Sequence, residues 1–192
     1  MLKEKLKNYN IILASKSPRR QQFFKDLNID FTIKLKEVKE LYPQQLKGIE
    51  ITDYLANLKA KAYKDLKDND LLITSDSIVW LENKALGKPK NYHEAFVMLK
   101  NLSGKKHEVI TSISIKNKNF QKIINDITTV FFKKLSDKEI NYYINNYKPF
   151  DKAGAYGIQE WIGFIAIDKI EGSYFNVVGL PVHKLYKELM NL

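Results

Sequence analysis

Apolar residues with strand-like and helix-like spacing alternate along almost the whole chain, and this alternation limits it to α/β folds. The apolar run 10–15 predicts a buried strand, and the Ser17 and Pro18 that follow it are typical of a helix start. Residues 71–81 predict a second, longer buried strand. Because the alternation is not strict, we expect a mixed β-sheet rather than a purely parallel one.

Other segments complete this expectation. Phe31, Ile33 and Leu35 alternate as in a half-buried strand, and 109–115 and 120–132 predict two more strands. Residues 51–62 follow helical spacing, and a terminal helix is expected after Pro181. Two further helices are indicated by capping-box pairs, Asn91 with Glu94 and Ser136 with Glu139.

Length and composition exclude several classes of protein. The 192 residues are 44% hydrophobic, so we expect one domain over 1–192 with a substantial core. The chain has no cysteine, which excludes a disulfide scaffold, a thiol nucleophile and a thiolate zinc site. The apolar run 11–14 is too short for a signal sequence or a membrane span. We therefore expect a cytoplasmic protein without a membrane partner.

The histidines give no sign of a metal site. His93, His107 and His183 show no metal-ligand spacing.

The positive charge is distributed unevenly between the two basic residue types. The net charge is +10, and every basic residue except Arg19 and Arg20 is a lysine. The lysines are scattered, as on a solvated surface, and no basic-aromatic stripe accompanies them, so no nucleic-acid partner is expected. The adjacent arginines indicate a role that lysine cannot fill, such as bidentate contact with a phosphate or a carboxylate.

Ser15, Ser17, Arg19 and Arg20 stand together at the start of the first long predicted helix. Unpaired N–H groups and the helix dipole favour an anion there, so these residues are candidates for a phosphate-binding corner. An ordinary N-cap with solvated arginines explains the same residues, and the local sequence does not decide between the two. The segment is not a P-loop, because no Gly-rich run ending in Gly-Lys-Ser/Thr occurs.

Asp76 lies within an apolar strand, between Ser75 and Ser77. A carboxylate in that place must be solvated, paired or bound to a cation, because a bare buried charge is costly. It is a candidate for a metal ligand or for the group that takes a proton from water. The alternative is a strand end or bulge in which the neighbouring hydroxyls satisfy the carboxylate.

Two turns carry further cations. Residues 151–159 combine Lys152, glycines, Tyr156 and Gln159, which fits a loop where Lys152 meets a phosphate and Gln159 reads a base edge. A glycine-rich turn with a surface ion pair explains the same segment. Lys88 lies in a Gly-Lys-Pro turn, a pattern that alone indicates only a turn.

Taken in order, these segments resemble the Maf family of nucleotide pyrophosphatases. The resemblance implies a mixed, twisted β-sheet flanked by helices, similar to inosine triphosphatases, with two lobes around a central cleft. It also implies hydrolysis of nucleoside triphosphates between the α- and β-phosphates with a divalent cation, Mg²⁺ or Mn²⁺. The matching segments are 13–20, 59–62, 76–79, 86–89, 102–104 with His107, 151–159, 171–174 and 178–181.

The resemblance assigns roles by position. Asp76 matches the family's proton acceptor, and Arg19, Ser77 and Gln159 match positions that set base preference. Glu40 matches a polar position of the family's cleft, and Glu40 and Asp76 would hold the divalent cation through hard oxygen ligands. Lys59, Lys88 and Lys152 match other polar positions of the family's cleft and, with Arg19 and Arg20, would supply positive charge to a triphosphate.

Residues 155–159, together with Ser-Pro-Arg-Arg at 17–20, resemble the subgroup that acts on dTTP and UTP more than the 7-methyl-GTP subgroup. Three positions depart from the usual pattern: Ser75 replaces alanine, Ser77 replaces threonine and Glu160 replaces glycine. We therefore expect a house-cleaning enzyme for pyrimidine or modified nucleotides. The sequence does not decide whether the protein forms a homodimer. The alternatives are a 7-methyl-GTP pyrophosphatase, a nucleic-acid-binding module and a non-catalytic regulator of cell division.

Overall fold

The computed structural model describes residues 1–192, and the chain forms two compact units. Unit 1 comprises residues 1–76, 111–126 and 179–192, and unit 2 comprises residues 77–110 and 127–178. Three long strands, β3 (Asp70–Leu81), β5 (Lys106–Lys116) and β6 (Gln121–Phe132), contribute residues to both units.

The strands form a mixed sheet of seven strands in the order β2–β1–β3–β5–β6–β7, with β4 paired to β3. β1 (Asn10–Leu13) pairs in parallel with β2 (Thr32–Ile33) and with β3. β4 (Lys84–Leu86) runs antiparallel to β3, and β7 (Ile167–Glu171) runs antiparallel to β6. The predicted mixed sheet is thereby confirmed.

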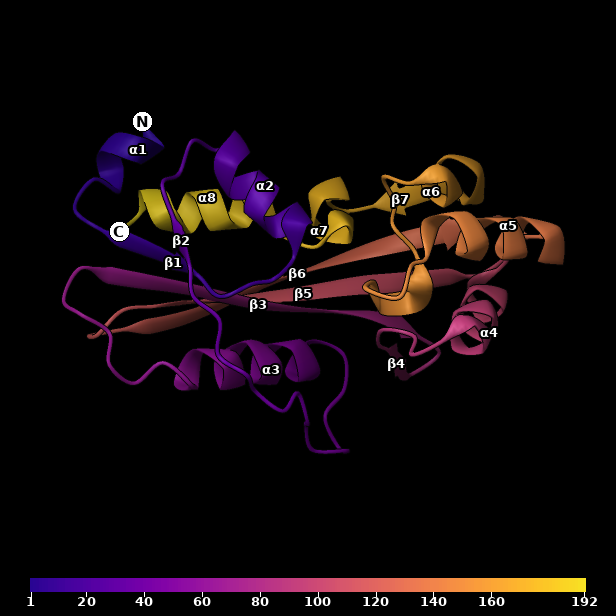
Figure 1. Cartoon of the computed structure of the whole chain (residues 1–192), viewed down its shortest axis with the longest axis horizontal. Coiled ribbons are helices and arrows are strands. Elements are labelled where there is room, and N and C mark those ends of the chain that lie inside the picture. The colour runs from indigo at the N-terminus through magenta and orange to yellow at the C-terminus, as the bar shows by residue number, and fades with distance from the viewer. The chain divides into compact units, whose positions relative to one another are not determined.

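Unit 1 has helices on both faces of its strands. Neighbouring side chains of a strand point to opposite faces, so the consecutive apolar residues of β1 need cover on both sides. Ile11 and Leu13 of β1 pack in one buried cluster with Phe24, whereas Ile12 packs with Leu72 in another. Figure 1 shows α3 on one side of these strands and α1, α2 and α8 on the other. The helices are α1 (Leu2–Lys5), α2 (Pro18–Asp26), α3 (Ile49–Lys61) and α8 (Val182–Met190).

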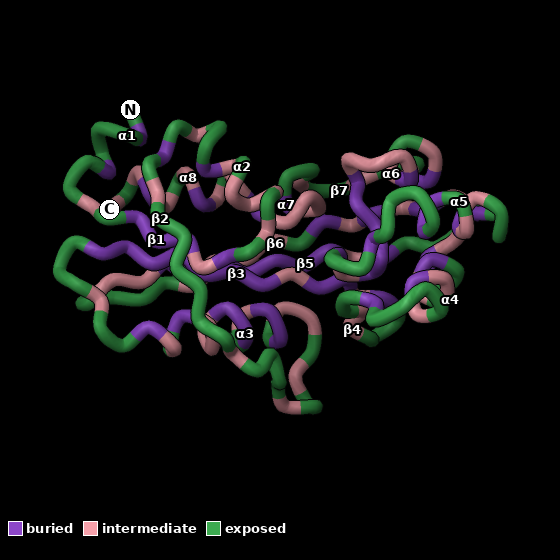
Figure 2. The backbone as a smooth tube through the Cα atoms, in the orientation of Figure 1, coloured by how far each residue is buried: buried purple, intermediate pink, exposed green.

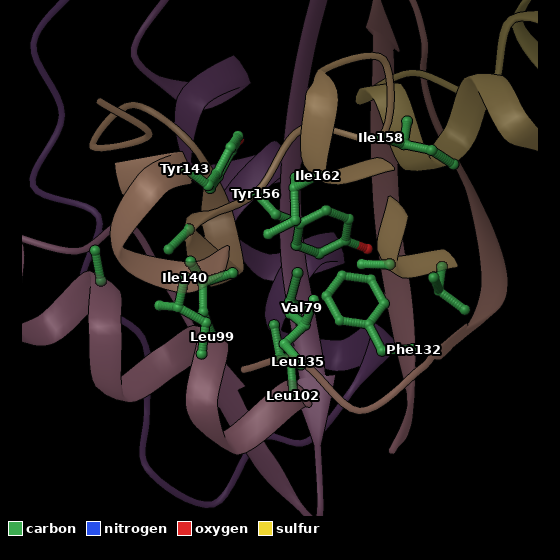
Figure 3. Close-up of a cluster of buried hydrophobic side chains, with 14 of the residues drawn as sticks. Val79, Leu99, Leu102, Phe132, Leu135, Ile140, Tyr143, Tyr156, Ile158 and Ile162 are labelled. Carbon is green, nitrogen blue, oxygen red and sulfur yellow. The ribbon is translucent and has the colours of Figure 1, made fainter. Parts of the chain in front are cut away.

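Unit 2 surrounds a second core, drawn in Figure 3. Val79 of β3, Leu99, Phe132 of β6, Tyr143 and Ile162 are all buried in it. The predicted capping box forms completely: Ser136 accepts from the Glu139 backbone, and the Glu139 side chain accepts from the Ser136 backbone. The helices of this unit are α4 (Tyr92–Leu102), α5 (Asp137–Tyr147), η1 (Ala153–Ala155), α6 (Trp161–Ala166) and α7 (Tyr174–Val178).

Two predictions from the sequence need correction. The half-buried strand expected around Phe31 is only two residues long, and Ile33 and Leu35 are 47% and 48% exposed. β2 pairs with β1 alone, and the chain beyond it, up to α3, is mostly exposed, as Figure 2 shows. The strand end that was one alternative for Asp76 is wrong, because β3 continues through Ser75, Asp76 and Ser77.

Candidate active site

Asp76 is a buried carboxylate of β3 that is 7% exposed and belongs to unit 1. Its Oδ1 accepts a hydrogen bond from Lys59 Nζ at 2.6 Å. Burial raises the pKa of Asp76, while the positive charges of Lys59 and Arg20 and the Lys59 hydrogen bond lower it. A carboxyl group with a raised pKa holds a proton more readily, which suits a group that takes a proton from water.

Lys59 joins Asp76 to a second carboxylate. Its ammonium lies 3.0 Å from Glu40 Oε1, on the segment between β2 and α3, and 2.6 Å from Asp76 Oδ1. Lys59 comes from α3, which packs over the strand that carries Asp76. Two carboxylates therefore converge on one cation, although 36 residues separate them in the chain.

This convergence tests whether the predicted metal ligands fit a divalent cation. Glu40 and Asp76 offer hard oxygen ligands that already share a positively charged partner, Lys59. No group of three or more His, Asp or Glu side chains able to hold a metal ion is present. Mg²⁺ commonly uses one or two carboxylates together with substrate phosphates and water, so this pair fits it.

Arg20 is bound to the backbone at two places. Its Nε donates to Gly179 O at 2.8 Å, and its Nη1 donates to Ser75 O at 3.1 Å. Burial lowers the pKa of the Arg20 guanidinium and the negative charge of Asp76 raises it, so the guanidinium and the Asp76 carboxylate lie within electrostatic reach. An arginine remains charged in proteins, so Arg20 adds fixed positive charge to the Asp76 cluster.

The start of α2 has the predicted cap. Ser17 Oγ accepts from the Arg20 backbone N–H at 3.4 Å, and Ser15 Oγ accepts from the Ser17 N–H at 3.2 Å. Pro18 occupies the first helical turn. Both hydroxyls thus accept hydrogen bonds from backbone N–H groups. Arg19, in the first turn of α2, is partly buried.

In unit 2, Lys152 is held by two carboxylates. Its Nζ lies 2.7 Å from Asp151 Oδ1 and 3.0 Å from Glu160 Oε1, and its side chain is only 9% exposed. The second oxygen of Glu160 accepts from Tyr143 Oη, on α5. An ion pair near Lys152 was one of the alternatives that the sequence left open, but the sequence did not point to Glu160 and Tyr143 as its members.

Gln159 lies in a tight turn that Glu160 closes. The Glu160 N–H donates to Gly157 O at 3.0 Å, so residues 157–160 form a β-turn with Gln159 at its third position. Gln159 Oε1 is buried and has no hydrogen-bond partner. A buried unpaired acceptor is costly unless a ligand donates to it, so this amide fits a ligand-reading role.

The Lys88 turn is tied to the loop that carries Lys152. The Gly154 N–H donates to Gly87 O at 3.0 Å, and Lys88 itself is exposed. Gly154 has a φ of +69°, and a Cβ there would lie 2.7 Å from Val79 Cγ2. Ser77, the other predicted site residue of unit 2, is partly exposed and directly follows Asp76 on β3.

His107 is a buried residue whose surroundings the sequence did not reveal. Its Nε2 lies 2.8 Å from Tyr156 Oη, and its Nδ1 has no partner. Figure 3 shows the Tyr156 and Phe132 rings side by side in the same core. His107 therefore connects β5 to the loop that precedes Gln159.

Comparison with known proteins gives consistent matches over the whole chain. A family model described as Maf-like protein matches residues 10–192. A protein of Flavobacterium johnsoniae named dTTP/UTP pyrophosphatase is 62% identical over 193 residues, with 100% of both chains covered. A protein of Bacteroides fragilis with the same name is 49% identical over 189 residues, covering 97% of this chain and 98% of its own.

Solved structures share the fold at low sequence identity. A HAM1 protein from Coxiella burnetii matches with a TM-score of 0.53 and 13% identity, covering 96% of this chain and 100% of that one. The Ham1 protein of Staphylococcus aureus matches with a TM-score of 0.50 and 17% identity, covering 93% and 99%. No helix of this chain has the length and apolar character needed to cross a membrane.

Proposed function

Because the chain belongs to the Maf family, we propose that it is a nucleoside triphosphate pyrophosphatase that hydrolyses dTTP and UTP to the monophosphate and pyrophosphate. Two relatives with this name are 62% identical to the chain, and the matches cover 100% and 98% of their lengths. One structural observation carries the proposal: the buried Asp76 and the exposed Glu40 converge on Lys59, beside Arg20. We expect the enzyme to act on the nucleotide pool of the cytoplasm.

Asp76 is the proposed general base. It takes a proton from water as the water oxygen forms a bond to the α-phosphorus, and the bond from that phosphorus to the bridging oxygen of the β-phosphate breaks. The leaving pyrophosphate carries away the electron pair of the broken bond. Burial raises the pKa of Asp76, which makes the carboxylate a stronger base than an exposed aspartate.

Fixed cations are the second requirement of this reaction. A nucleoside triphosphate carries about four negative charges, which must be held while pyrophosphate leaves. We assign this role to Arg19, Arg20, Lys59, Lys88 and Lys152, with Ser15 and Ser17 at the start of α2. Glu40 and Asp76 would hold Mg²⁺ or Mn²⁺. When bound, such an ion stabilises charge on phosphate oxygens.

Gln159 is the proposed reader of the base. Its buried Oε1 lacks a donor, and the N3–H of uracil or thymine is a donor of the required kind. Cytosine presents an unprotonated N3 acceptor in the same place and would leave Oε1 unpaired. Together with Arg19 and Ser77, Gln159 would thus favour UTP and dTTP over CTP.

A nucleotide panel with identified products tests the proposal. The protein is incubated with Mg²⁺ and dTTP, UTP, CTP or 7-methyl-GTP, and the monophosphate and pyrophosphate are quantified separately from diphosphate and phosphate. We expect dTTP and UTP to be converted fastest, with pyrophosphate as the co-product. Release of phosphate alone, or faster turnover of 7-methyl-GTP, would contradict the assignment.

Asp76→Asn is the matching variant. Removing a general base lowers kcat by about 10²–10⁴-fold, and we expect a loss in that range. Asp126→Asn is the control, because Asp126 is another mostly buried aspartate of unit 1, 12% exposed and 2.7 Å from Lys184 Nζ. Full activity in Asp76→Asn would exclude the proposed role, and equal losses in both variants would indicate a general effect on folding.

A further inference from the structure

We propose that Glu160, supported by Tyr143, is a positioning residue that places both Lys152 and Gln159 for nucleotide binding. The inference rests on the proposed function and adds to it two residues that do not themselves contact substrate. Glu160 uses each side-chain oxygen for a different partner: Oε1 for the Lys152 ammonium at 3.0 Å and Oε2 for the Tyr143 hydroxyl.

The backbone of the same residue fixes the turn that carries Gln159. The Glu160 N–H donates to Gly157 O at 3.0 Å, and the Glu160 carbonyl accepts from Gly163 N at 2.8 Å. Tyr143 Oη also accepts from the Gly157 N–H at 3.1 Å. Tyr143 is therefore bonded to both ends of the turn, and the position of Gln159 depends on these bonds.

Close packing leaves the turn little room to shift. A Cβ on Gly157 would lie 2.9 Å from Glu160 Cδ and 3.1 Å from Lys152 Cε, so both side chains rest against the bare glycine backbone. Tyr143 is fully buried, with 0% exposure, and its ring stacks on Tyr147 with centroids 5.1 Å apart. Tyr143, which holds Glu160, is thus part of the buried core of unit 2.

The charges explain why Lys152 needs this positioning. An ammonium has three N–H donors, and Asp151 and Glu160 accept two of them. The remaining donor has a fixed direction as long as both carboxylates hold. Asp151 is mostly exposed, with a side-chain exposure of 55% against 20% for Glu160, so Glu160 is the more firmly placed of the two partners.

Steady-state kinetics of Glu160→Ala with UTP and CTP test the inference. We expect KM for UTP to rise about tenfold and kcat to change by less than about threefold, since the lost bonds hold binding groups rather than the reacting atoms. We expect the preference for UTP over CTP, measured as the ratio of kcat/KM values, to fall about tenfold, because the variant loses the side-chain bond to Tyr143 that ties the Gln159 turn to α5. A merely structural role would lower the melting temperature without changing this ratio.

Two further variants keep the test decisive. Tyr143→Phe removes only the hydroxyl, leaves the ion pair of Glu160 with Lys152, and should lower the UTP preference more than it raises KM. Glu139→Ala is the control, because Glu139 caps the same helix, α5, but contacts neither Lys152 nor Gln159. It should lower stability and leave the UTP preference unchanged.

The possible outcomes separate this inference from the proposed function. If wild-type protein releases pyrophosphate from UTP while folded Glu160→Ala retains the wild-type KM and preference, the positioning role is wrong and the proposed function stands. If Glu160→Ala does not fold, an unchanged preference in Tyr143→Phe overturns the inference. If the wild-type protein itself lacks turnover, the proposed function and this inference both fail.

Discussion

Protonation of His107 should destabilise the fold by an amount that the structure allows us to work out. The side chain is 3% exposed and packs edge-on against the rings of Phe132 and Tyr156. Nδ1 has no hydrogen-bond partner, so a proton added to the ring would be buried without one. Burial accordingly lowers the pKa of His107 from 6.5 to about 4.

The sign of the effect follows from the pH at which the folded and the unfolded chain each bind the proton. Between the two pKa values the unfolded chain is protonated and the folded chain is not, so the free energy of unfolding falls as pH drops below 6.5. At about 1.36 kcal/mol per pKa unit, the full difference amounts to about 3 kcal/mol once pH is below both values. By pH 5 the loss should already be about 2 kcal/mol.

Urea unfolding followed by tryptophan fluorescence measures this loss. The chain's two tryptophans, Trp80 and Trp161, both belong to unit 2, as does His107, so the signal reports on the relevant core. Wild type and His107→Gln are compared near pH 7.5 and near pH 5, because the difference between the two proteins cancels the titration of other groups. Wild type should lose about 2 kcal/mol more than the variant on acidification. Equal losses would refute the reasoning.

Two further predictions concern pH dependence and packing. Lys59→Met removes the charge and hydrogen bond that lower the pKa of Asp76, so the acid limb of the kcat/KM profile should move to higher pH; an unmoved limb would exclude Asp76 as the titrating group. Gly163→Ala places a Cβ 1.8 Å from Ile158 O and should destabilise the protein by about 3 kcal/mol or more in urea unfolding. Gly87→Ala, with nothing within 4 Å of the added Cβ, should change stability far less, and similar losses in the two variants would contradict the packing argument.

The fold could largely be predicted from local patterns. Ser17 and Pro18 gave the start of α2 correctly, and the capping pair Ser136 and Glu139 gave the start of α5, because these signals act within one helical turn. The strand around Ile33 was predicted too long, since alternation records which residues can be buried and not whether a partner covers them. β4 and α6 were not predicted, because segments this short carry little periodicity.

The candidate site could be predicted only in part. A carboxylate inside an apolar strand identified Asp76 on physical grounds, and the structure supplies its partner Lys59, 17 residues away in the chain. Glu40 came from the family resemblance alone. Tyr143 and Glu160 could not have been paired from the sequence, because their contact depends on how α5 packs against the 157–160 turn. Side-chain networks of this kind arise only when distant segments meet.

The hydrogen bond from Gly154 to Gly87 has a consequence for protein engineering. Two segments more than sixty residues apart share one backbone connection, and Gly154 tolerates no side chain against Val79. A chimera could take only one of these segments from a relative with another nucleotide preference. The hydrogen bond and the packing between the two segments would then join residues from different proteins. Exchanging residues 86–89 and 151–160 together preserves the contact between the two segments.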